Sequence, residues 1–396
     1  MKDIIVISNF CSNITKKSNG RFQYICEELI KEGNEVELII SDYNHDRKNR
    51  DLNIEKGIKF KVTILHEKGY KKNVSFQRLM SHYSWGREVK KYLMLRKKPD
   101  VIYCAVPPLI GALEAARHCK KNGIRFVIDI QDLWPEAFKL VLNIPVVSEI
   151  IFSPLSAIAN GIYKRADAIC GVSETYVMQA VKRNRKVEEG TVVFLGTNLA
   201  TFDKNVINNK VNKNSNVLWI GYCGTLGACY DLTVIIDALK ILSDRGVPVP
   251  ILIVMGDGER RKEFEEHASS LKIPSVFTGI LPYDQMCGRL SACDIVVNPI
   301  MHNAAQSIIN KHADYAAAGL PVINTQENKE YRDLIDRYYM GFNCNNGDAK
   351  NVAECIERLV NDKNLRKQMG KNARRCAEEL FDRGRTYSDL ISVIIE

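Results

Sequence analysis

The chain has 396 residues, which is long enough to form two full hydrophobic cores. Its hydrophobic content of 45% and charged content of 26% are ordinary for a globular protein, and no run reaches the ~18 apolar residues that span a bilayer. The net charge of +9 comes from one half: residues 1–200 hold 32 Lys and Arg against 22 Asp and Glu (+10), and residues 201–396 hold 24 against 25 (−1). An acidic partner is therefore expected to bind the first half.

Short apolar runs alternate with helical patterns in the first half. The opening run, in MKDIIVISNF, has the length of a strand, and we expect no secretory signal there. This run predicts a strand at Ile4–Ser8, and later runs predict strands at Val36–Ser41, Val101–Ala105, Phe126–Ile130, Ala168–Val172 and Val192–Leu195. The segments between them predict helices at Arg21–Glu32, Phe76–Arg96, Leu109–Lys121, Ser148–Lys164 and Glu174–Val181.

The alternation breaks at Thr201–Asn216, an Asn-rich segment with few large apolar side chains, which we interpret as a linker. After it, strands are predicted at Val217–Tyr222, Pro250–Met255, Ser275–Thr278, Asp294–Asn298, Pro321–Asn324 and Gly341–Asn343. Helices are predicted at Leu232–Asp244, Arg260–Leu271, Asp284–Ala292, Asn310–Ala318, Asp348–Asn361, Leu365–Leu380 and Thr386–Ile395.

This order of elements predicts an α/β protein. Nearly continuous apolar strands separated by helices indicate parallel sheets covered on both faces. We therefore expect two doubly wound, Rossmann-like domains, residues 1–200 and 217–375, facing across a cleft, with a linker at 201–216. In such folds ligands bind beyond the carboxyl ends of the strands.

The segment Gln306–Thr325, QSIINKHADYAAAGLPVINT, is the most informative part of the chain. Three small residues precede Gly319, which suits the left-handed position after a helix, and Pro321 cannot continue the helix. The start of this helix offers free backbone N–H groups beside Lys311, which together suit a phosphate. Asp314, one turn later, could accept hydrogen bonds from hydroxyl groups. The alternative is an ordinary surface helix over a sheet.

Glycine-containing loops follow several predicted strands. They are Ser18–Gly20, Gly221–Gly227, Gly256–Glu259 and Gly279–Pro282. Each is weak evidence because glycine is common at strand-to-helix turns, but together with Gln306–Thr325 they indicate an anion site. None matches GxGxxG or GxxxxGK[ST], so dinucleotide and P-loop enzymes are disfavoured. The twelve Cys have no metal-ligand spacing and are expected to be buried free thiols.

These segments together resemble a known family. The second half resembles the donor domain of the family 4 retaining glycosyltransferases, which have the GT-B fold, in IGYCGTLGACYDL, ILIVMGDGE, VFTGILPYDQM, ACDIVVNPI and SIINKHADYAAAGLPVI. The first half adds NGRFQYICEELIKEGNEVELI, DIQDLWPEAF and ADAICGVSETYVMQAV. The DLWPE segment is similar to the branch that builds bacterial surface polysaccharides of the capsule or O-antigen type.

The resemblance implies an activity and which substrate each domain would bind. The chain would be a hexosyl- or N-acetylhexosaminyltransferase that moves a sugar from a UDP-type sugar nucleotide to a polyprenyl-diphosphate-linked saccharide. Residues 1–200 would bind the acceptor and residues 217–375 the donor, and the C-terminal helix, within 376–396, would pack back on the first domain.

The resemblance also implies roles for individual residues. Asp314 takes the place of the acid that binds the donor ribose, and Gln306 stands where the family has an acid that contacts the transferred sugar. Asp132 falls where a His often lies beside the reacting sugar, and Lys311 is the candidate for the diphosphate, with Arg260 as a second. We therefore predict Asp132, Lys311 and Gln306 as catalytic. The predicted donor-binding residues are Gly20, Gly224, Thr225, Gly256, Asp257, Gly258, Arg260, Gly279, Ile280, Leu281, Gln306, Ser307, Ile308, Ile309, Lys311 and Asp314. Among these, the backbone N–H groups of Ser307 to Ile309 would be available to sugar and phosphate.

The chemistry needs concentrated positive charge. Lys311, Gly20 and helix N-termini can stabilise the leaving diphosphate, so we expect no metal or other cofactor. Retention would follow from displacement on one face of the sugar, as the resemblance implies. Asp132 has a plainer alternative role, in which it only caps the helix before Trp134 and Pro135.

A lipid-linked acceptor would bring the basic first half to a membrane. Basic and aromatic residues mix at helical spacing in Arg78–Lys98, which suits anionic headgroups. We therefore expect a cytoplasmic protein, peripheral at the inner face of the cell membrane, with no nucleic-acid partner. The alternative is a solvated basic helix face.

Two other functions stay open. A same-fold UDP-N-acetylhexosamine 2-epimerase would turn over donor without any acceptor. A non-catalytic sugar-nucleotide-binding protein would bind donor and never consume it.

Overall fold

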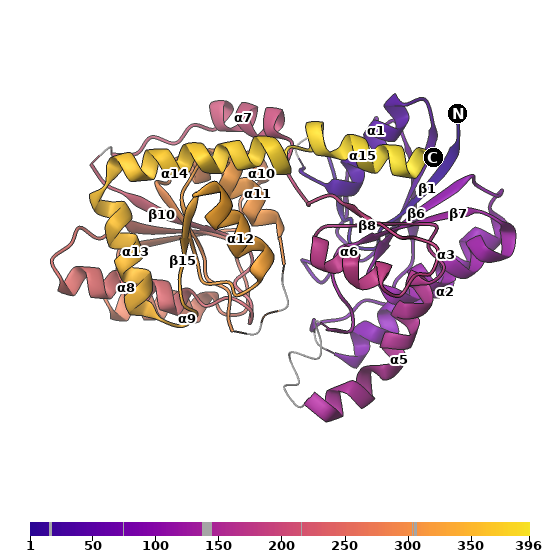
Figure 1. Ribbon diagram of the computed structural model, residues 1–396, viewed down its shortest axis with the longest axis horizontal. Coiled ribbons are helices and arrows are strands. Elements are labelled where there is room, and N and C mark those ends of the chain that lie inside the picture. Colours follow the sequence, from indigo (N-terminus) through magenta and orange to yellow (C-terminus); the bar gives the residue numbers. More distant parts are fainter. Residues whose placement is uncertain (16–17, 74, 137–144, 215, 303, 305–306) are drawn as a thin grey trace. The chain divides into compact units, whose positions relative to one another are not determined.

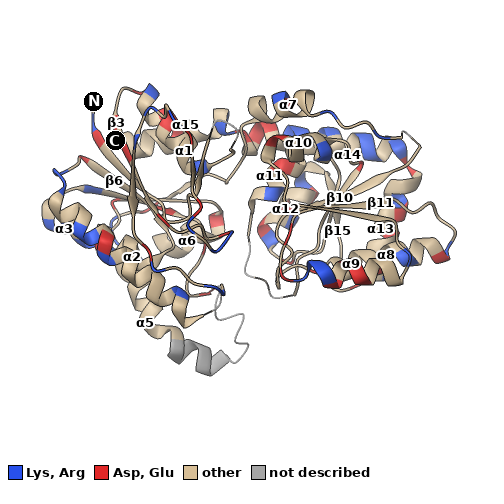
Figure 2. Cartoon of the chain, turned by 180° about the vertical axis from the view of Figure 1, so that it is seen from behind, with Lys and Arg blue, Asp and Glu red and all other residues tan. Residues whose placement is uncertain are grey.

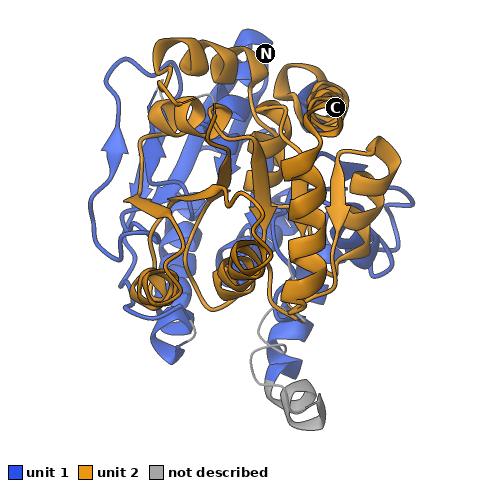
Figure 3. Cartoon of the chain, turned by 90° about the vertical axis from the view of Figure 1, so that its left-hand side faces the viewer, with its two compact units in different colours: residues 1–194, 387–396 blue, residues 195–386 orange. Residues whose placement is uncertain are grey.

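The computed structural model describes residues 1–396 except 16–17, 74, 137–144, 215, 303 and 305–306 (Figure 1). The chain divides into two compact units, Met1–Phe194 with Tyr387–Glu396, and Leu195–Thr386 (Figure 3). We call them unit 1 and unit 2. Over the described residues, none of the helices has both the length and the apolar content that crossing a bilayer requires.

Unit 1 is built on a seven-stranded sheet in the order β5-β3-β1-β6-β7-β8-β9, with every pair parallel. Its strands are β1 (Asp3–Ile7), β3 (Glu35–Ser41), β5 (Lys61–Leu65), β6 (Val101–Val106), β7 (Arg125–Ile130), β8 (Ala168–Gly171) and β9 (Thr191–Val192), beside a small pair, β2 (Asn13–Ile14) and β4 (Asn53–Ile54). Its helices are α1 (Arg21–Lys31), α2 (Phe76–Leu95), α3 (Leu109–Asn122), α5 (Pro145–Tyr163) and α6 (Glu174–Val181).

Unit 2 is built on a six-stranded parallel sheet in the order β12-β11-β10-β13-β14-β15. Its strands are β10 (Trp219–Cys223), β11 (Ile251–Met255), β12 (Ser275–Gly279), β13 (Ile295–Asn298), β14 (Val322–Asn324) and β15 (Gly341–Asn343). Its helices are α7 (Leu199–Asn208), α8 (Leu232–Asp244), α9 (Arg261–Ser270), α10 (Tyr283–Ser291), α11 (Asn310–Ala317), α12 (Lys329–Tyr338), α13 (Ala349–Asn361) and α14 (Lys363–Cys376), followed by a π-helical turn (Ala377–Phe381) and α15 (Arg383–Ile395).

The predicted fold class, α/β with two doubly wound parallel sheets, is confirmed. In both sheets the strand order reverses beside the first strand, at β1 and at β10, and such switch points are where ligands bind in this class of fold. The central strands are fully buried, as in β6, because helices cover both faces of the sheet.

The prediction of a linker at 201–216 is wrong for the first half of that segment. Residues Leu199–Asn208 form helix α7, which packs on α10 in unit 2. Asn198 caps this helix by accepting a hydrogen bond from the backbone N–H of Thr201 at 2.8 Å, and Leu199 and Phe202 are buried. The Asn-rich composition suggested a linker, but one capping Asn and two buried apolar side chains are enough to stabilise a short helix on a neighbour.

The C-terminal segment divides between the units. Residues 376–386 lie in unit 2 and only Tyr387–Glu396 belong to unit 1, where Tyr387, Leu390 and Ile394 join the hydrophobic core. Strand β5 and helix α12 were not predicted. The edge strand β5 has no fully buried residue, so its apolar pattern is weak.

A buried ion pair joins the parts of unit 1. The Arg21 guanidinium on α1 donates to the Asp129 carboxylate at the centre of the sheet, with Nε–Oδ2 at 2.9 Å. It also donates to the Tyr387 hydroxyl at 2.6 Å and to the carbonyl of Phe194 at 3.1 Å. Asp129 is fully buried and accepts a further bond from Tyr103 at 2.5 Å. One side-chain cluster therefore connects α1, β6, β7 and the C-terminal helix.

We predict that Asp129→Asn lowers the free energy of unfolding of unit 1 by about 3–5 kcal/mol, because it leaves the Arg21 charge buried without its partner. Urea denaturation measures this change. The exposed Asp389→Asn, on α15, is the control and should stay within about 0.5 kcal/mol of the parent. Equal stability of the two variants would contradict the structural importance of the pair.

Candidate functional site

Helix α11 starts at the carboxyl edge of the unit 2 sheet, between β13 and β14. The helix ends as the sequence predicts: Ala318 is the last residue with helical dihedrals, and Gly319 has a φ of 65° in the left-handed region. Gly319 also lies close to α14, since a Cβ there would be 3.4 Å from the carbonyl oxygen of Gly370. The small residues Ala313, Ala316 and Ala317 are all buried, which brings α11 close to its neighbours.

Lys311 lies in the first turn of α11 and is only 6% exposed. Its ammonium lies over two aromatic rings, 4.2 Å from the centroid of Tyr222 and 4.0 Å from that of Tyr230. Within the described part of the chain, Nζ has no hydrogen-bond partner. Burial disfavours the charged form and lowers the pKa of Lys311 to about 7. Among the described side chains, the positive charge of Lys311 is balanced only by the faces of two aromatic rings. Such a buried cation is suited to bind an anionic group of a substrate.

Asp314 is also buried, at 7% exposure, so the ordinary surface helix considered above is excluded at this position. Its Oδ1 accepts a hydrogen bond from the Tyr283 hydroxyl at 2.8 Å, and that hydroxyl lies 2.7 Å from Thr197 Oγ1. Burial raises the pKa of Asp314 to about 6, although the hydrogen bond from Tyr283 opposes the shift. The Asp314 carboxylate therefore already accepts one hydrogen bond, and a ribose hydroxyl would be a second donor to the same carboxylate.

The glycine loops of unit 2 interlock with one another. A Cβ on Gly256 would lie 1.8 Å from the carbonyl oxygen of Gly224, and a Cβ on Gly258 would lie 2.4 Å from that of Leu226. Backbone bonds join the same loops, from Leu226 N–H to the Asp257 carbonyl at 2.9 Å and from Gly224 N–H to the Met255 carbonyl at 3.0 Å. Packing between loops therefore requires glycine at 256 and 258, whether or not a ligand approaches them.

Gly224 differs from those two glycines because it also borders Lys311. Its φ is 137°, and a Cβ there would be 3.3 Å from both Cε and Nζ of Lys311. The neighbouring carbonyl of Thr225 accepts a hydrogen bond from the Tyr222 hydroxyl at 2.7 Å, which fixes one of the two rings under Lys311. Gly224 and Thr225 are thus placed beside the predicted diphosphate residue.

The remaining loop residues are placed less favourably. Arg260, the second candidate for the diphosphate, makes a two-pronged ion pair with Glu263 at 2.5 and 2.8 Å and donates to the Tyr230 carbonyl at 2.6 Å. Asp257 accepts from the Gly258 N–H at 2.8 Å, which closes its own turn. Gly279 has a φ of 72° and pairs with Gly256, while the adjacent Ile280 is 75% exposed and Leu281 is half-buried.

The segment before α11 corrects one prediction. The backbone N–H of Ile309 donates to His312 Nδ1 at 3.3 Å, so it is not open to a ligand as predicted. His312 is itself buried and stacks on Tyr331 with ring centroids 3.5 Å apart. Ser307 and Ile308 are also buried, and Gln306 lies outside the described residues.

A buried amide network, which the sequence did not reveal, supports this segment. Asn298 and Asn324 stand opposite each other in the register of β13 and β14, and Asn298 Nδ2 donates to Asn324 Oδ1 at 2.8 Å. Asn298 Nδ2 also donates to Gln326 Oε1 at 2.9 Å, and Gln326 Nε2 donates to the Ser307 carbonyl at 2.8 Å. All three amides are fully buried. The one sequence signal was a polar residue ending each of two buried strands.

The predicted residues of unit 1 have local roles. Asp132 accepts hydrogen bonds from the Leu133 N–H at 2.9 Å and from Trp134 Nε1 at 3.2 Å, so both of its carboxylate oxygens are engaged in its own loop. Burial raises the pKa of Asp132. Gly20 precedes α1 as its N-terminal cap, and a Cβ there would meet nothing closer than 3.6 Å. Among the described residues, Asp132 thus stabilises its own turn, and these two contacts are not bonds to a helix N-terminus.

The remaining candidates are metal-ligating residues and cysteines. Among the described residues, no group of three or more His, Cys, Asp or Glu is placed to hold a metal ion. The cysteines are free thiols and buried as predicted, apart from Cys229, which is exposed.

Residues 203–376 match the model of the family described as glycosyl transferases group 1. The matched range lies within unit 2 and covers less than half of the chain. The matched range holds α11 with Lys311 and Asp314, the interlocked loops and the amide network. A glycosyltransferase of capsular polysaccharide biosynthesis, CapM of Staphylococcus aureus, is 26% identical over 245 residues, which cover 58% of this chain and 61% of CapM.

Solved structures extend the likeness beyond residues 203–376 to the whole chain. HepE of Anabaena, in complex with UDP, superposes with a TM-score of 0.71 over 99% of both chains at 14% identity. The sucrose-phosphate synthase of Thermosynechococcus elongatus superposes with a TM-score of 0.72 over 99% of this chain and 100% of its own, at 17% identity. At such identities the likeness shows the fold, which is GT-B with two Rossmann-like domains.

The burial of Lys311 predicts a pH-dependent cost in stability. Its folded pKa of about 7 lies below its ordinary value of 10.5, so between these values the unfolded chain holds a proton that the folded chain has released. Stability therefore rises with pH across this window, and the whole penalty is present below pH 7. We predict that Lys311→Met is more stable than the parent at pH 6, by on the order of 3 kcal/mol.

Urea denaturation at pH 6 and pH 9 checks this prediction. The difference between parent and variant should shrink by half or more at pH 9, because the parent has then lost most of its folded-state penalty. The exposed Lys262→Ala in the same unit is the control and should show no such dependence. A Lys311→Met variant less stable than the parent at pH 6 would rule out an uncompensated ammonium.

Proposed function

We propose that the chain is a retaining glycosyltransferase of bacterial surface polysaccharide synthesis. It takes a hexosyl or N-acetylhexosaminyl group from a UDP-type sugar nucleotide and adds it to a saccharide carried on polyprenyl diphosphate. The observation that carries the donor half of this proposal is the buried Lys311 ammonium between two tyrosine rings, at the start of a helix and at the carboxyl edge of the sheet. The helix start adds partial positive charge on the same side.

The relatives support the same donor class. HepE of Anabaena is described in complex with UDP and with UDP-glucose, and CapM acts in capsule synthesis. Asp314 is placed one turn after Lys311, where it would accept a hydrogen bond from the ribose while keeping its bond to Tyr283. The exposed Ile280 and the backbone of Gly279 and Leu281 are candidates for contact with the base.

The proposed chemistry breaks the bond between the anomeric carbon and the diphosphate oxygen. Negative charge grows on the leaving diphosphate, and Lys311 with the α11 N-terminus stabilises it, so the proposal requires no metal ion. A bond forms between the anomeric carbon and an acceptor hydroxyl on the same face of the sugar. The hydroxyl proton passes to the leaving phosphate oxygen, which balances the step without a protein base.

Two predicted catalytic residues have lesser parts in this proposal. Gln306 remains a prediction for contact with the transferred sugar. A contact between Asp132 and that sugar also remains a prediction, and would require Asp132 to exchange one of its two loop hydrogen bonds.

We predict that Lys311→Ala lowers turnover more than it weakens donor binding, because the charge that Lys311 meets is greatest in the transition state. Lys311→Arg should restore only part of the rate, since the planar guanidinium does not fit the space of an ammonium. Asp314→Ala should weaken donor binding by about 1–3 kcal/mol through the lost bond to ribose.

Donor titration by calorimetry, and release of UDP with and without acceptor, measure these effects. The exposed Lys262→Ala should behave as the parent does. Wild-type turnover in Lys311→Ala would remove this residue from the site, and unchanged affinity in Asp314→Ala would remove that one. Donor conversion without any acceptor would favour an epimerase, and donor binding without consumption would favour a non-catalytic binding protein.

The acceptor half of the proposal places the protein in the cytoplasm at the inner face of the membrane. Helix α2 supports it, because its exposed side chains combine apolar Met94 and Leu95, 68% and 88% exposed, with exposed Lys90 and Lys91, which also pair with Glu114 and Glu88. Figure 2 colours the positions of Lys and Arg blue along the chain. Not every basic residue of Arg78–Lys98 belongs to this face. Arg96 is paired with Asp3 and Glu37, and Arg78 lies against the Trp134 ring at 4.6 Å.

We predict that the protein binds vesicles of anionic lipid reversibly and that binding falls as salt rises, because screening shortens the reach of surface charge to roughly 8–10 Å. Reversing Lys90, Lys91, Lys97 and Lys98 to Glu should abolish binding while leaving donor affinity unchanged. Vesicle co-sedimentation measures this. Co-sedimentation of the reversed variant equal to that of the parent would mean that this face of α2 is only solvated.

A further inference from the structure

Unit 1 contains a hollow, separate from the residues discussed so far, that lies at the carboxyl ends of the edge strand β5 and its neighbour β3. Three segments form its wall: the loop after β3, the loop after β5 and the first two turns of α2. Its volume is about 440 Å³, and its lining residues are Tyr43, Lys48, Asn49, Arg50, Lys68, Gly69, Tyr70, Lys71, Gln77, Met80 and Ser81. This volume is typical of small-molecule sites.

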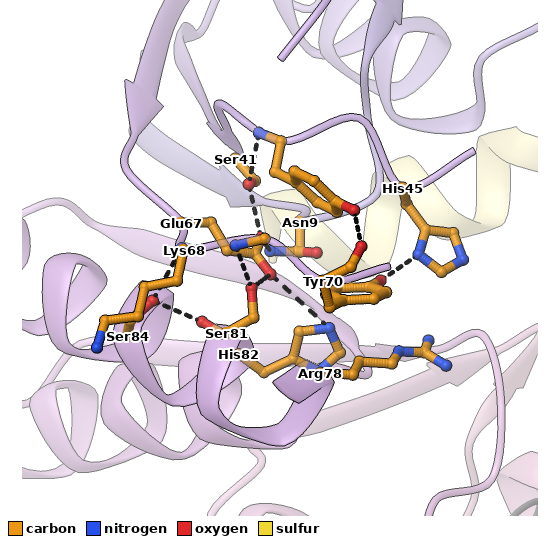
Figure 4. A network of polar contacts seen from close by, with 12 residues as sticks. Asn9, Ser41, His45, Glu67, Lys68, Tyr70, Arg78, Ser81, His82 and Ser84 are labelled. Carbon is orange, nitrogen blue, oxygen red and sulfur yellow. Dashed lines mark hydrogen bonds and ion pairs between the residues drawn. The ribbon is translucent and has the colours of Figure 1, made fainter. Parts of the chain in front are cut away.

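Buried hydrogen bonds hold the walls of the hollow in place (Figure 4). Glu67, only 1% exposed, accepts from Asn9 at 2.7 Å and from Ser41 and Ser81 at 2.6 Å each, and so joins the loop after β1 to β3 and α2. Ser81 in turn accepts from the Gly69 N–H at 2.8 Å. Gly69 has a φ of 84°, and a Cβ there would come within 2.8 Å of the Tyr43 ring. The hollow is therefore formed by a fixed framework.

The lining is strongly basic. It contains Lys48, Arg50, Lys68 and Lys71 and no Asp or Glu. Arg50 is paired with Asp42 behind the lining, so its charge is partly neutralised. Lys68 and Lys71 are exposed and, in the described part of the chain, form no ion pair, and Figure 4 shows the Lys68 side chain at the outer edge of the network. The hollow therefore presents a net positive charge.

The direction of α2 adds to this charge. Ser75 caps the helix by accepting from the Arg78 N–H at 3.2 Å, and Gln77, in the first turn, lines the hollow. The α2 N-terminus, with its partial positive charge, thus lies at the same wall as the lysines. Among the described residues, the two lysines without an ion pair, Lys68 and Lys71, together with a helix start and no lining carboxylate, favour an anion with more than one charge.

Apolar side chains stand beside the basic hollow. Phe76 is 75% exposed, Met80 is 41% exposed and lines the hollow, and Tyr83 is 49% exposed. They are spaced at 76, 80 and 83, which places them on one face of α2. A free inorganic anion would not contact these apolar side chains, whereas the chain of a lipid that carries a phosphate would cover them.

We propose that the hollow binds the phosphate or diphosphate group of a lipid whose chain lies on Phe76, Met80 and Tyr83. This inference rests on the proposed function, because it assigns the lipid-phosphate part of the acceptor to a place in unit 1. The lysines meet the phosphate oxygens, and the apolar strip meets the first isoprenoid or acyl units. The hollow is distinct from Lys90 to Lys98, which lie toward the far end of α2.

The test uses the full-length protein and three probes: farnesyl diphosphate, inorganic pyrophosphate and farnesol, each titrated by calorimetry below its aggregation concentration. The parent should bind farnesyl diphosphate most tightly. The double substitution Lys68→Ala, Lys71→Ala should weaken farnesyl diphosphate at least tenfold. Phe76→Ser should weaken farnesyl diphosphate severalfold and leave pyrophosphate unchanged.

Two controls separate the hollow from other charges. Lys120→Ala with Lys121→Ala removes the same charge from the last turn of α3 and should have no effect. Lys311→Met removes the proposed donor-site cation and so shows how much farnesyl diphosphate binds there instead; the proposal expects most of the affinity to remain.

Three outcomes overturn the proposal. If Lys311→Met lost farnesyl diphosphate binding and the Lys68, Lys71 variant kept it, the diphosphate would bind in unit 2. Equal affinity for pyrophosphate and farnesyl diphosphate would show a site for free anions. Equal weakening by the α3 control would show unspecific charge. In each case UDP binding by the parent is measured separately, so failure here is distinguishable from failure of the proposed function.

Discussion

The proposed donor site depends on one unfavourable contact, a lysine ammonium buried between two tyrosine rings. Lys311 is held there because α11 starts at the sheet edge, Tyr222 belongs to β10, and the turn with Gly224 has no side chain to separate them. Burial of an uncompensated charge lowers stability, and the rest of unit 2 offsets that loss with a continuous hydrophobic core. A diphosphate would supply the missing counter-charge, so the same contact that weakens the free protein would strengthen its complex.

The surroundings of Lys311 are rigid. The loops after β10 and β11 interlock through glycines that no other residue could replace without moving backbone. The amides of Asn298, Asn324 and Gln326 tie the ends of two strands to the carbonyl of Ser307, just before α11. Such preorganisation places charges before the reaction starts, which is how enzymes stabilise a developing charge at low cost. The hollow of unit 1 follows a similar plan, with Glu67 joining three elements behind a basic wall.

The sequence predicted the sheets and the end of α11 well, because buried parallel strands and a Gly-Leu-Pro stop have strong local signals. It failed where tertiary contacts decide. Helix α7 in the Asn-rich segment forms on α10, and half-exposed β5 forms only as the edge of a sheet. It also predicted Lys311 and Asp314 without their partners, because Tyr222, Tyr230 and Tyr283 are distant in sequence and carry no motif. Asp132 and the N–H of Ile309 were expected to face substrate. Instead, Asp132 accepts a hydrogen bond from Trp134, and the N–H of Ile309 donates to His312.

Lys311 is half protonated near pH 7 in the free protein, and we expect it to become fully charged when the donor diphosphate binds. The direct measurement is calorimetric titration with a UDP-sugar at pH 8 in two buffers of different ionisation enthalpy. Since the pKa of Lys311 is about 7 in the free protein, binding should take up close to one proton per donor, and Lys311→Met should take up none. Donor binding by the parent without proton uptake, or the same uptake in Lys311→Met, would contradict this account.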